Sequence, residues 1–330
     1  MKLKVSVIGV GHLGSIHAKL WKQHERAELV GVYDVNTESA AIKAQELNVP
    51  LFDSIDYAIA ESDAITIAVP TSEHFDVAMQ CLQQNKHVLI EKPITHTYQQ
   101  ALTLIEEAKK RNLIIQVGHV ERFNPALVAA NEYNLRPLFI ETHRLSQFRP
   151  RATDVSVIHD LMIHDIDIVL WLAQSSAKSI SANGVAVLTE TPDLANARVE
   201  FENGCVANFT ASRISAAPMR KMRIFQKNAY LSLDFAKPSI EVYRLADNDE
   251  KSSGVPAMML GQIEQGTKQK NIVYEQPTVV QSNAIAEEQK SFIASVLDNA
   301  PVSVTATDAA EALRIAEEIT RIIESQTTDL

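Results

Sequence analysis

The sequence predicts an α/β fold: a doubly wound parallel sheet over residues 1–120, then an α+β domain with a mostly antiparallel open sheet over residues 121–330. Up to residue 120, short apolar runs alternate with helical patterns of about 10 to 15 residues, which is typical of crossover units in a parallel sheet covered on both faces. Beyond that point, strand-like runs follow one another with few helices between them, which is typical of an antiparallel sheet.

The elements of the first domain follow from two patterns. Short apolar runs that end in turn residues predict strands, and apolar residues at helical spacing predict helices. The expected strands are Leu3–Ile8, Leu29–Tyr33, Ala64–Ala68, His87–Ile90 and Ile114–Val117. The expected helices are Leu13–His24, Glu38–Leu47, Ile55–Ala60, Phe75–Gln84 and Tyr98–Arg111.

The second domain is expected to open with two helical segments and to continue as strands separated by turn residues. The segment 245–284 has the least ordered pattern, and two amphipathic helices close the chain. The expected helices are Pro125–Tyr133, Ile158–Ala173, Ala284–Leu297 and Asp308–Glu324, of which the last can pack back on the first domain. The expected strands are Ser179–Val187, Leu194–Phe201, Cys205–Ser212, Met222–Gln226, Tyr230–Asp234, Ile272–Tyr274 and Thr278–Val280.

The composition excludes several classes of protein. With 330 residues, 46% of them hydrophobic, the chain can form two ordinary globular cores. A formal net charge of −10 opposes non-specific binding to nucleic acid or to an anionic membrane. No apolar run approaches the ~20 residues of a membrane span, and we expect no targeting segment. The two cysteines, Cys81 and Cys205, imply no disulfide framework and favour the cytoplasm.

A glycine-rich turn joins the first strand to the first helix. Glycine is needed where the backbone bends sharply, where it approaches a pyrophosphate and where helix meets sheet, so Gly9, Gly11 and Gly14 each have a separate task. The N–H groups of His12 and Leu13 at the helix start can hold phosphates. This spacing predicts a dinucleotide site, and a purely structural turn is the competing interpretation.

The second strand ends on an acidic residue, Asp34, twenty positions after Gly14. A carboxylate at this place can accept both ribose hydroxyls of NAD. A 2′-phosphate would be repelled by it and would find no nearby base, since no Arg or Lys occurs from Val35 to Ile42. We therefore expect NAD rather than NADP as the cofactor.

Two further strand ends carry residues suited to binding, because ligands of open α/β sheets lie beyond the carboxyl ends of the strands. One is followed by Pro70, Thr71 and His74, and the other by Glu91, Lys92 and Pro93. Since the proline keeps Lys92 out of helical geometry, we expect an extended lysine that faces cofactor or substrate and acts as proton carrier or hydroxyl donor. A solvated surface lysine is the alternative.

The helical segment near residue 160 is rich in His and Asp. At about 100° per residue, Asp160, His164 and Asp167 share one stripe, whereas His159 diverges from His164. A carboxylate four residues from an imidazole can orient it, which suits a base that takes a hydroxyl proton. Histidines five apart do not suit a metal site, so we expect no metal. A histidine that satisfies a buried hydrogen bond explains the pattern equally well.

Two further groups of polar residues have open interpretations. Arg122 and Asn124 follow the last strand of the first domain, where they can face substrate or nicotinamide, or cap the domain junction. Arg220, Lys221 and Arg223 favour the solvated side of a strand over contact with a diphosphate.

The chain resembles the Gfo/Idh/MocA oxidoreductase family over essentially its whole length. The resemblance rests on the order and separations of the glycine turn, Asp34, Glu91-Lys92-Pro93, Arg122-Phe123 and Asp160-x-x-x-His164. The resemblance implies an N-terminal Rossmann domain and a homodimer or homotetramer formed through the C-terminal sheet. It implies catalytic roles for Lys92, His164 and Asp160. The expected cofactor-binding residues are Gly9, Gly11, His12, Leu13, Gly14, Asp34, Pro70, Thr71, His74, Glu91 and Lys92, and the expected substrate-binding residues are Lys92, Arg122, Asn124, Asp160 and His164.

The activity implied by the resemblance is NAD-dependent oxidation of a secondary hydroxyl of a sugar, cyclitol or sugar nucleotide. The stretches 117–125 and 160–167 are similar to those of members that oxidise the 3-hydroxyl of UDP-N-acetylhexosamines. The bulky stretch 156–159 departs from the Gly-rich residues of many members. An NAD-dependent glycoside hydrolase with transient redox chemistry, or a non-catalytic NAD or sugar sensor, is the alternative.

Overall fold

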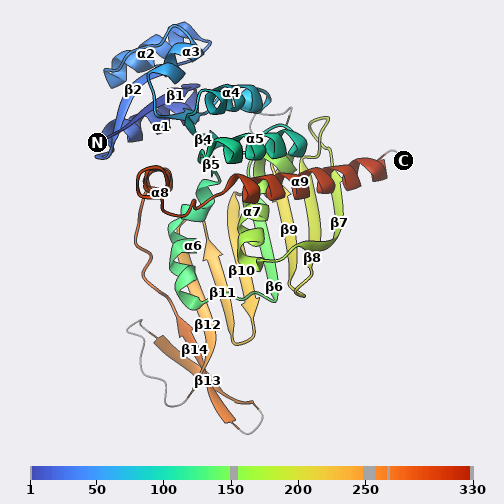
Figure 1. Ribbon diagram of the computed structural model, residues 1–330. Coiled ribbons are helices and arrows are strands. Elements are labelled where there is room, and N and C mark those ends of the chain that lie inside the picture. The colour runs from blue at the N-terminus through green and yellow to red at the C-terminus, as the bar shows by residue number, and fades with distance from the viewer. Residues whose placement is uncertain (1, 149–154, 248–256, 266–267, 328–330) are drawn as a thin grey trace. The chain divides into compact units, whose positions relative to one another are not determined.

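The computed structural model describes residues 2–148, 155–247, 257–265 and 268–327. The chain falls into two compact units, coloured by residue number in Figure 1. Unit 1 comprises the chain up to Val120 together with Asn283–Arg314, and unit 2 comprises Glu121–Ser282 together with the chain from Ile315 onward. Among the helices within the described ranges, none has both the length and the apolarity needed to cross a bilayer.

Unit 1 contains a five-stranded parallel sheet with strand order β2-β1-β3-β4-β5, which confirms the predicted fold class. Helix α1 packs on β1 and β2, and α4 packs on β3 and β4. The strands are β1 (Leu3–Ile8), β2 (Ala27–Tyr33), β3 (Ala64–Ile67), β4 (His87–Glu91) and β5 (Ile115–Gly118). The helices are α1 (His12–Gln23), α2 (Thr37–Leu47), α3 (Ile55–Ala60), α4 (Thr71–Gln83), α5 (Tyr98–Arg111) and α8 (Ala284–Asp298).

The core of unit 1 joins the sheet to a helix from the far end of the sequence. Trp21 of α1 is fully buried, and its indole N–H donates to Thr66 Oγ1 of β3 at 2.8 Å. Phe292 of α8 lies edge-on to the Trp21 ring with 6.4 Å between centroids. Helix α8 therefore completes a core that the first 120 residues begin.

Unit 2 contains a nine-stranded sheet with strand order β13-β14-β12-β11-β10-β6-β9-β8-β7. Every neighbouring pair is antiparallel except β6 with β9, so the predicted mostly antiparallel sheet is confirmed. The strands are β6 (Phe139–Leu145), β7 (Ala177–Val185), β8 (Leu194–Phe201), β9 (Val206–Ser212), β10 (Met219–Gln226), β11 (Ala229–Asp234), β12 (Ser239–Asp247), β13 (Ala257–Gln265) and β14 (Lys268–Glu275).

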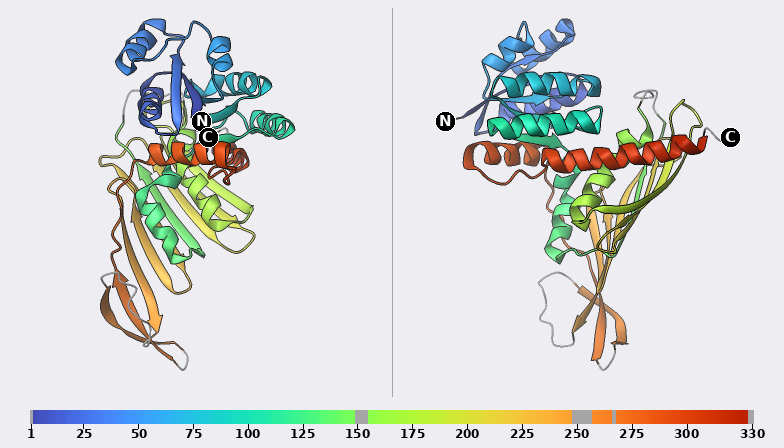
Figure 2. Two further views of the ribbon diagram at one scale, coloured as in Figure 1. Left: turned by 60° about the vertical axis from the view of Figure 1, so that its left-hand side comes forward. Right: turned by 45° about the vertical axis from the view of Figure 1, so that its right-hand side comes forward.

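The two faces of this sheet differ. Helices α6 (Pro125–Ala130) and α7 (Ile163–Ala173) cover one face, which Figures 1 and 2 show. Inward residues alternate with outward ones along each strand, as in β10, where Met222 and Ile224 are fully buried while Arg223 is exposed. The opposite face carries a row of half-exposed aromatic rings across five strands, with centroid separations of 4.8 to 5.8 Å.

Several predicted elements need correction. Strand β6 was not predicted, because Glu, Thr, His and Arg interrupt its apolar residues. The segment predicted to be least ordered contains part of β12 and, within its described residues, all of β13 and β14, whose pairing supplies order that composition does not reveal. Residues 278–280 form no strand.

The helices also differ from their predicted limits. Helix α4 begins four residues earlier than predicted, directly after Pro70. The predicted helix at 125–133 ends as α6 at Ala130 and continues as a 3₁₀ turn. The predicted helix at 158–173 begins with a π-helical turn, Ile158–Met162. The closing helix α9 spans Ala306–Thr327.

Unit 1 contains one carboxyl group in an unusual environment. The Glu288 side chain on α8 is fully buried, and neither of its oxygens has a hydrogen-bond partner in the described part of the chain. Burial, reinforced by the charge of Glu91, raises the pKa of Glu288 well above its ordinary value. Burial therefore favours the protonated, uncharged form of Glu288.

We predict that Glu288→Gln stabilises the protein increasingly as the pH rises above about 5. The unfolded chain releases this proton near pH 4 and the folded protein releases it at higher pH, so between these two points the wild type loses up to about 1.4 kcal/mol of unfolding free energy per pH unit. The glutamine side chain does not titrate, so the variant does not lose unfolding free energy in this way. Denaturant unfolding at several pH values measures the difference, with Glu287→Gln as the control on the same helix. A difference between Glu288→Gln and wild type that stays constant with pH would contradict the prediction.

Candidate active site

The glycine turn between β1 and α1 permits a very close approach of backbone segments. Gly9 has a positive φ of +87°, and a Cβ there would lie 2.6 Å from the Ala68 backbone beyond β3. A Cβ on Gly14 would lie 1.8 Å from the Gly9 carbonyl oxygen. Any other residue at Gly9 or Gly14 would therefore push α1 away from the sheet.

Gly11 differs from these two glycines, because a Cβ there would meet no atom of the protein within 4 Å. The position is the N-cap of α1, without a capping side chain and with no acidic residue in the first turn. The first-turn N–H groups of His12, Leu13 and Gly14 have no intrahelical acceptor. Open space and converging donors at a helix start fit the pyrophosphate of a dinucleotide.

Asp34 at the end of β2 is tied to this turn. Its Oδ2 accepts a hydrogen bond from the Val10 N–H at 2.8 Å, and its Oδ1 accepts one from the Asn36 N–H at 2.9 Å. Each carboxylate oxygen keeps a second lone pair, which a ribose hydroxyl can use. The residues at the end of β2 thus fit the adenosine ribose of NAD.

The loop between β3 and α4 is braced by a histidine. The buried His74 ring lies between the carbonyl oxygens of Pro93, 2.8 Å from Nδ1, and Val69, 3.0 Å from Nε2. Burial lowers the pKa of His74 although both carbonyls oppose this, so the ring is neutral and donates to one of them at a time. Both ring nitrogens face protein acceptors, so the structure makes His74 a link between two loops. The expected cofactor contacts of His74, Pro70 and Thr71 stay predictions.

Glu91 at the end of β4 forms a buried pair with His17 of α1, with 2.8 Å between Oε1 and Nε2. The Gln289 amide of α8 donates toward His17 Nδ1 at 3.2 Å and to the His17 carbonyl at 3.1 Å. With the amide so placed, Nδ1 accepts and the Nε2–H donates to Glu91. Burial would raise the pKa of Glu91, but the hydrogen bond from His17 and the charge of Lys92 outweigh it and lower the pKa.

Lys92 follows directly on this pair. Its backbone N–H donates to Glu91 Oε2 at 3.3 Å, and the peptide bond from Lys92 to Pro93 is cis. The side chain is half-exposed at the carboxyl end of the sheet. The His17–Glu91 pair therefore positions the backbone from which Lys92 extends.

In unit 2 the π-helical turn changes the predicted geometry of the His- and Asp-rich segment. Asp160 lies within the turn and His164 just after it, and both side chains are half-exposed. A π-helix bonds residues five apart, so the α-helical spacing of 100° per residue does not apply within this turn. The divergence of His159 from His164 stays a prediction. Among the described residues, no group of three or more His, Cys, Asp or Glu side chains has a metal-binding arrangement.

Asp167 differs in burial from Asp160 and His164, because its side chain is buried while theirs are half-exposed. Its buried carboxylate pairs with Arg122 in a two-pronged contact, at 2.8 Å to Nε and 2.7 Å to Nη2. The Arg122 guanidinium carbon lies 5.9 Å from the Trp171 ring centroid. Arg122 thus fixes α7 from the inside, because a paired guanidinium is stable when buried.

A second buried network lies at the other face of the α7 start. Arg144 of β6 donates to Asp165 through Nε and Nη2, at 3.1 and 2.7 Å, and to Glu121 through Nη1 at 2.9 Å. Burial opposes a charged arginine, but the carboxylates of Asp165 and Glu121 outweigh it and raise the pKa of Arg144. Asp165 follows His164 directly, so this network holds the first turn of α7, in which His164 lies.

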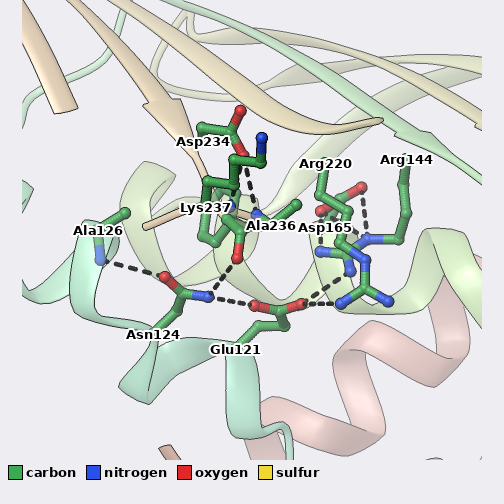
Figure 3. Close-up of polar contacts among 10 residues, drawn as sticks. Glu121, Asn124, Ala126, Arg144, Asp165, Arg220, Asp234, Ala236 and Lys237 are labelled. Carbon is green, nitrogen blue, oxygen red and sulfur yellow. Dashed lines mark hydrogen bonds and ion pairs between the residues drawn. The ribbon is translucent and has the colours of Figure 1, made fainter. Parts of the chain in front are cut away.

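Figure 3 shows Glu121 between Asn124 and the arginines. Asn124 Nδ2 donates to Glu121 Oε2 at 3.0 Å and to the Phe235 carbonyl at 3.2 Å, and its Oδ1 accepts from the Ala126 N–H. All hydrogen-bonding atoms of Asn124 are therefore engaged within unit 2, as the N-cap of α6. This geometry favours the capping interpretation of Asn124 over substrate contact.

Three contributors to the site were missed from the sequence. His17 had a usable signal, because it stands four residues before Trp21 on the apolar stripe of α1, where an unpaired imidazole would be costly. Arg144 and Glu121 had none, since β6 was not predicted and their partnership with Asp165 joins segments far apart in the sequence.

Comparison with known proteins gives consistent matches. Residues 3–119 match the model of the oxidoreductase family with an NAD-binding Rossmann fold, and residues 130–232 match the GFO/IDH/MocA C-terminal domain. The chain is 42% identical over 242 residues to UDP-N-acetylglucosamine 3-dehydrogenase of Acidithiobacillus ferrooxidans, covering 73% of this chain and 77% of that protein. It is 29% identical over 236 residues to the NAD(+)-dependent scyllo-inositol 2-dehydrogenase of Bacillus subtilis, covering 65% and 68%.

The solved structure of the Acidithiobacillus ferrooxidans enzyme aligns with a TM-score of 0.88 at 34% identity, over 98% of this chain and 99% of that one. This agreement extends the likeness through both units. The predicted family, oxidoreductase class and NAD cofactor are confirmed. The chain belongs to the Gfo/Idh/MocA oxidoreductase family, in which an NAD-binding Rossmann unit is joined to a unit built on an open sheet.

Proposed function

We propose that this protein oxidises a secondary hydroxyl of a sugar nucleotide with NAD, and that the reacting group is the 3-hydroxyl of a UDP-N-acetylhexosamine. The observation that carries the proposal is the 42% identity to a UDP-N-acetylglucosamine 3-dehydrogenase over most of both chains. Lys92, Asp160 and His164 stand in this sequence at the motif positions to which the family resemblance gives catalytic roles.

Bound NAD supplies the hydride acceptor. The protein's own groups bind the reacting hydroxyl and remove its proton. Lys92, whose backbone is positioned by the buried Glu91–His17 pair, donates to the hydroxyl oxygen and holds it. His164 takes the proton, and Asp160 orients the imidazole or binds the substrate. Both residues are half-exposed at the start of α7, where a substrate can reach them.

We predict that Lys92→Met and His164→Ala each lower kcat by roughly a hundred- to ten-thousand-fold, because a positioned proton carrier contributes that much. The affinity for NAD should change little. NADH absorbance with UDP-N-acetylglucosamine measures turnover, and a fluorescence titration measures NAD binding. Lys109→Met, an exposed lysine of α5, is the control. Near-normal turnover in both variants would refute the proposed mechanism.

The substrate class has its own test. We expect NADH to accumulate with UDP-N-acetylhexosamines and not with free sugars. Turnover with inositols instead would favour a cyclitol dehydrogenase, since a scyllo-inositol 2-dehydrogenase also matches this chain. No NADH with any compound, while NAD still binds, would refute the dehydrogenase and favour transient-redox hydrolysis or sensing. Release of free sugar then separates the hydrolase from the sensor.

We also propose that the protein forms a homodimer or homotetramer through the open face of the unit 2 sheet, and that it acts in the cytoplasm. The support for assembly is the row of adjacent aromatic rings on this face, which exposes apolar area that a second copy can cover. The row consists of Phe139, Phe225, Tyr230, Tyr243 and Tyr274.

We predict that Tyr243→Asp converts the assembly to monomers, because it places a charge between the rings of Tyr230 and Tyr274. Light scattering after size-exclusion chromatography measures the mass, and circular dichroism verifies that the fold is kept. A wild-type protein that is already monomeric at micromolar concentration would refute the assembly proposal.

A further inference from the structure

The three basic residues of β10 lie on different faces of the sheet. Arg223 Nη1 pairs with Glu141 Oε2 at 2.9 Å, and Lys221 Nζ lies 4.0 Å from Asp234 Oδ2. These two side chains alternate with the buried Met222 and so lie on the open face. Arg220 lies on the opposite face, which α6 and α7 cover.

Arg220 borders the buried network at the start of α7. In the strand register it stands directly opposite Arg144, and its Nη1 lies 3.6 Å from Glu121 Oε1. The two arginines differ in exposure, with 53% of the Arg220 side chain exposed and 4% of Arg144. Arg144 is committed to Asp165 and Glu121, whereas the side chain of Arg220 beside them is half-exposed. Figure 3 shows both arginines next to these carboxylates.

The backbone around Arg220 is held rigidly. The Phe235 N–H donates to the Arg220 carbonyl at 2.8 Å, and the N–H groups of Ala236 and Lys237 both donate to Asp234 Oδ1. The Phe235 carbonyl accepts from Asn124, which ties this turn to Glu121. The turn also carries an exposed lysine, Lys237, so a second cation stands near the end of β10.

We propose that Arg220 binds the diphosphate of a sugar-nucleotide substrate, an inference that rests on the proposed function. A guanidinium is suited to phosphate oxygens because its planar N–H groups bond two of them at once. Asp165, which pairs with Arg144 beside Arg220, follows the proposed base His164 in the chain. The network of Arg144, Asp165 and Glu121 therefore lies beside Arg220, the proposed anion-binding group. One of its members, Asp165, is the neighbour in the chain of His164, the proposed base. Lys221 and Arg223, neutralised on the open face, have no part in it.

The test compares Arg220→Gln with Arg136→Gln. Arg136 is an exposed arginine whose backbone N–H donates to Gln226 at the other end of β10, away from the network. Calorimetric titration measures the affinity of each protein for UDP and for uridine, and NADH absorbance measures kcat and KM for UDP-N-acetylglucosamine. Thermal unfolding of all three proteins reports on the fold.

We expect Arg220→Gln to weaken UDP binding and raise KM about ten- to a hundredfold, because bonds to a charged group are lost. Uridine affinity should stay within a fewfold of wild type, and kcat should fall much less than kcat/KM. Arg220→Lys should restore part of the UDP affinity, since it keeps the charge without the fork. Arg136→Gln should match wild type throughout.

Two results would overturn the inference alone: UDP affinity unchanged in Arg220→Gln, or UDP and uridine affinities that fall equally together with the melting temperature. The second result would make Arg220 a purely structural member of the network. A wild-type protein that neither binds UDP nor oxidises the UDP-sugar would overturn the proposed function as well.

Discussion

The close packing of α1 against the end of the parallel sheet is the constraint on which the rest of unit 1 depends. It requires the absence of a side chain at Gly9 and Gly14, where added atoms would meet backbone at 2.6 and 1.8 Å. Once α1 is seated, its next two turns bring His17 to Glu91 and Trp21 to Thr66. The helix whose first turn fits a pyrophosphate therefore also positions the strand end that carries Lys92.

Buried charge is organised by pairing in both units. Two nearby carboxyl groups in a low-dielectric interior oppose each other's ionisation, so the pKa of Glu91, which is bonded to His17, is lowered while burial and the charge of Glu91 raise the pKa of Glu288. In unit 2, Arg144 compensates Asp165 and Glu121 together. Ion pairs of this kind contribute little net stability, but breaking one is costly, so they hold a single geometry.

The two networks orient groups that do not themselves belong to them. Glu91 accepts from the backbone of Lys92, and Arg144 holds Asp165, the residue directly after His164. The side chains proposed for chemistry stay half-exposed while their neighbours are buried and bonded. Rigid support beneath an accessible reactive group is what proton transfer and hydroxyl binding require.

The sequence alone determined the features that arise within a few residues of one another. Glycine spacing, Asp34 at a strand end and the alternation of apolar runs predicted the dinucleotide turn, the cofactor and the fold class. These follow from local sterics and periodicity, which need no knowledge of distant partners.

Only the tertiary structure decided how the site is held. The pairing of His17 with Glu91 and of Arg144 with Asp165 joins residues 74 and 21 positions apart, and a π-helical turn precedes the helix that carries His164. The position of Arg220 opposite Arg144 needed the register of β10 with β6. Contacts between distant segments depend on packing and strand register, and no local pattern in the sequence encodes them.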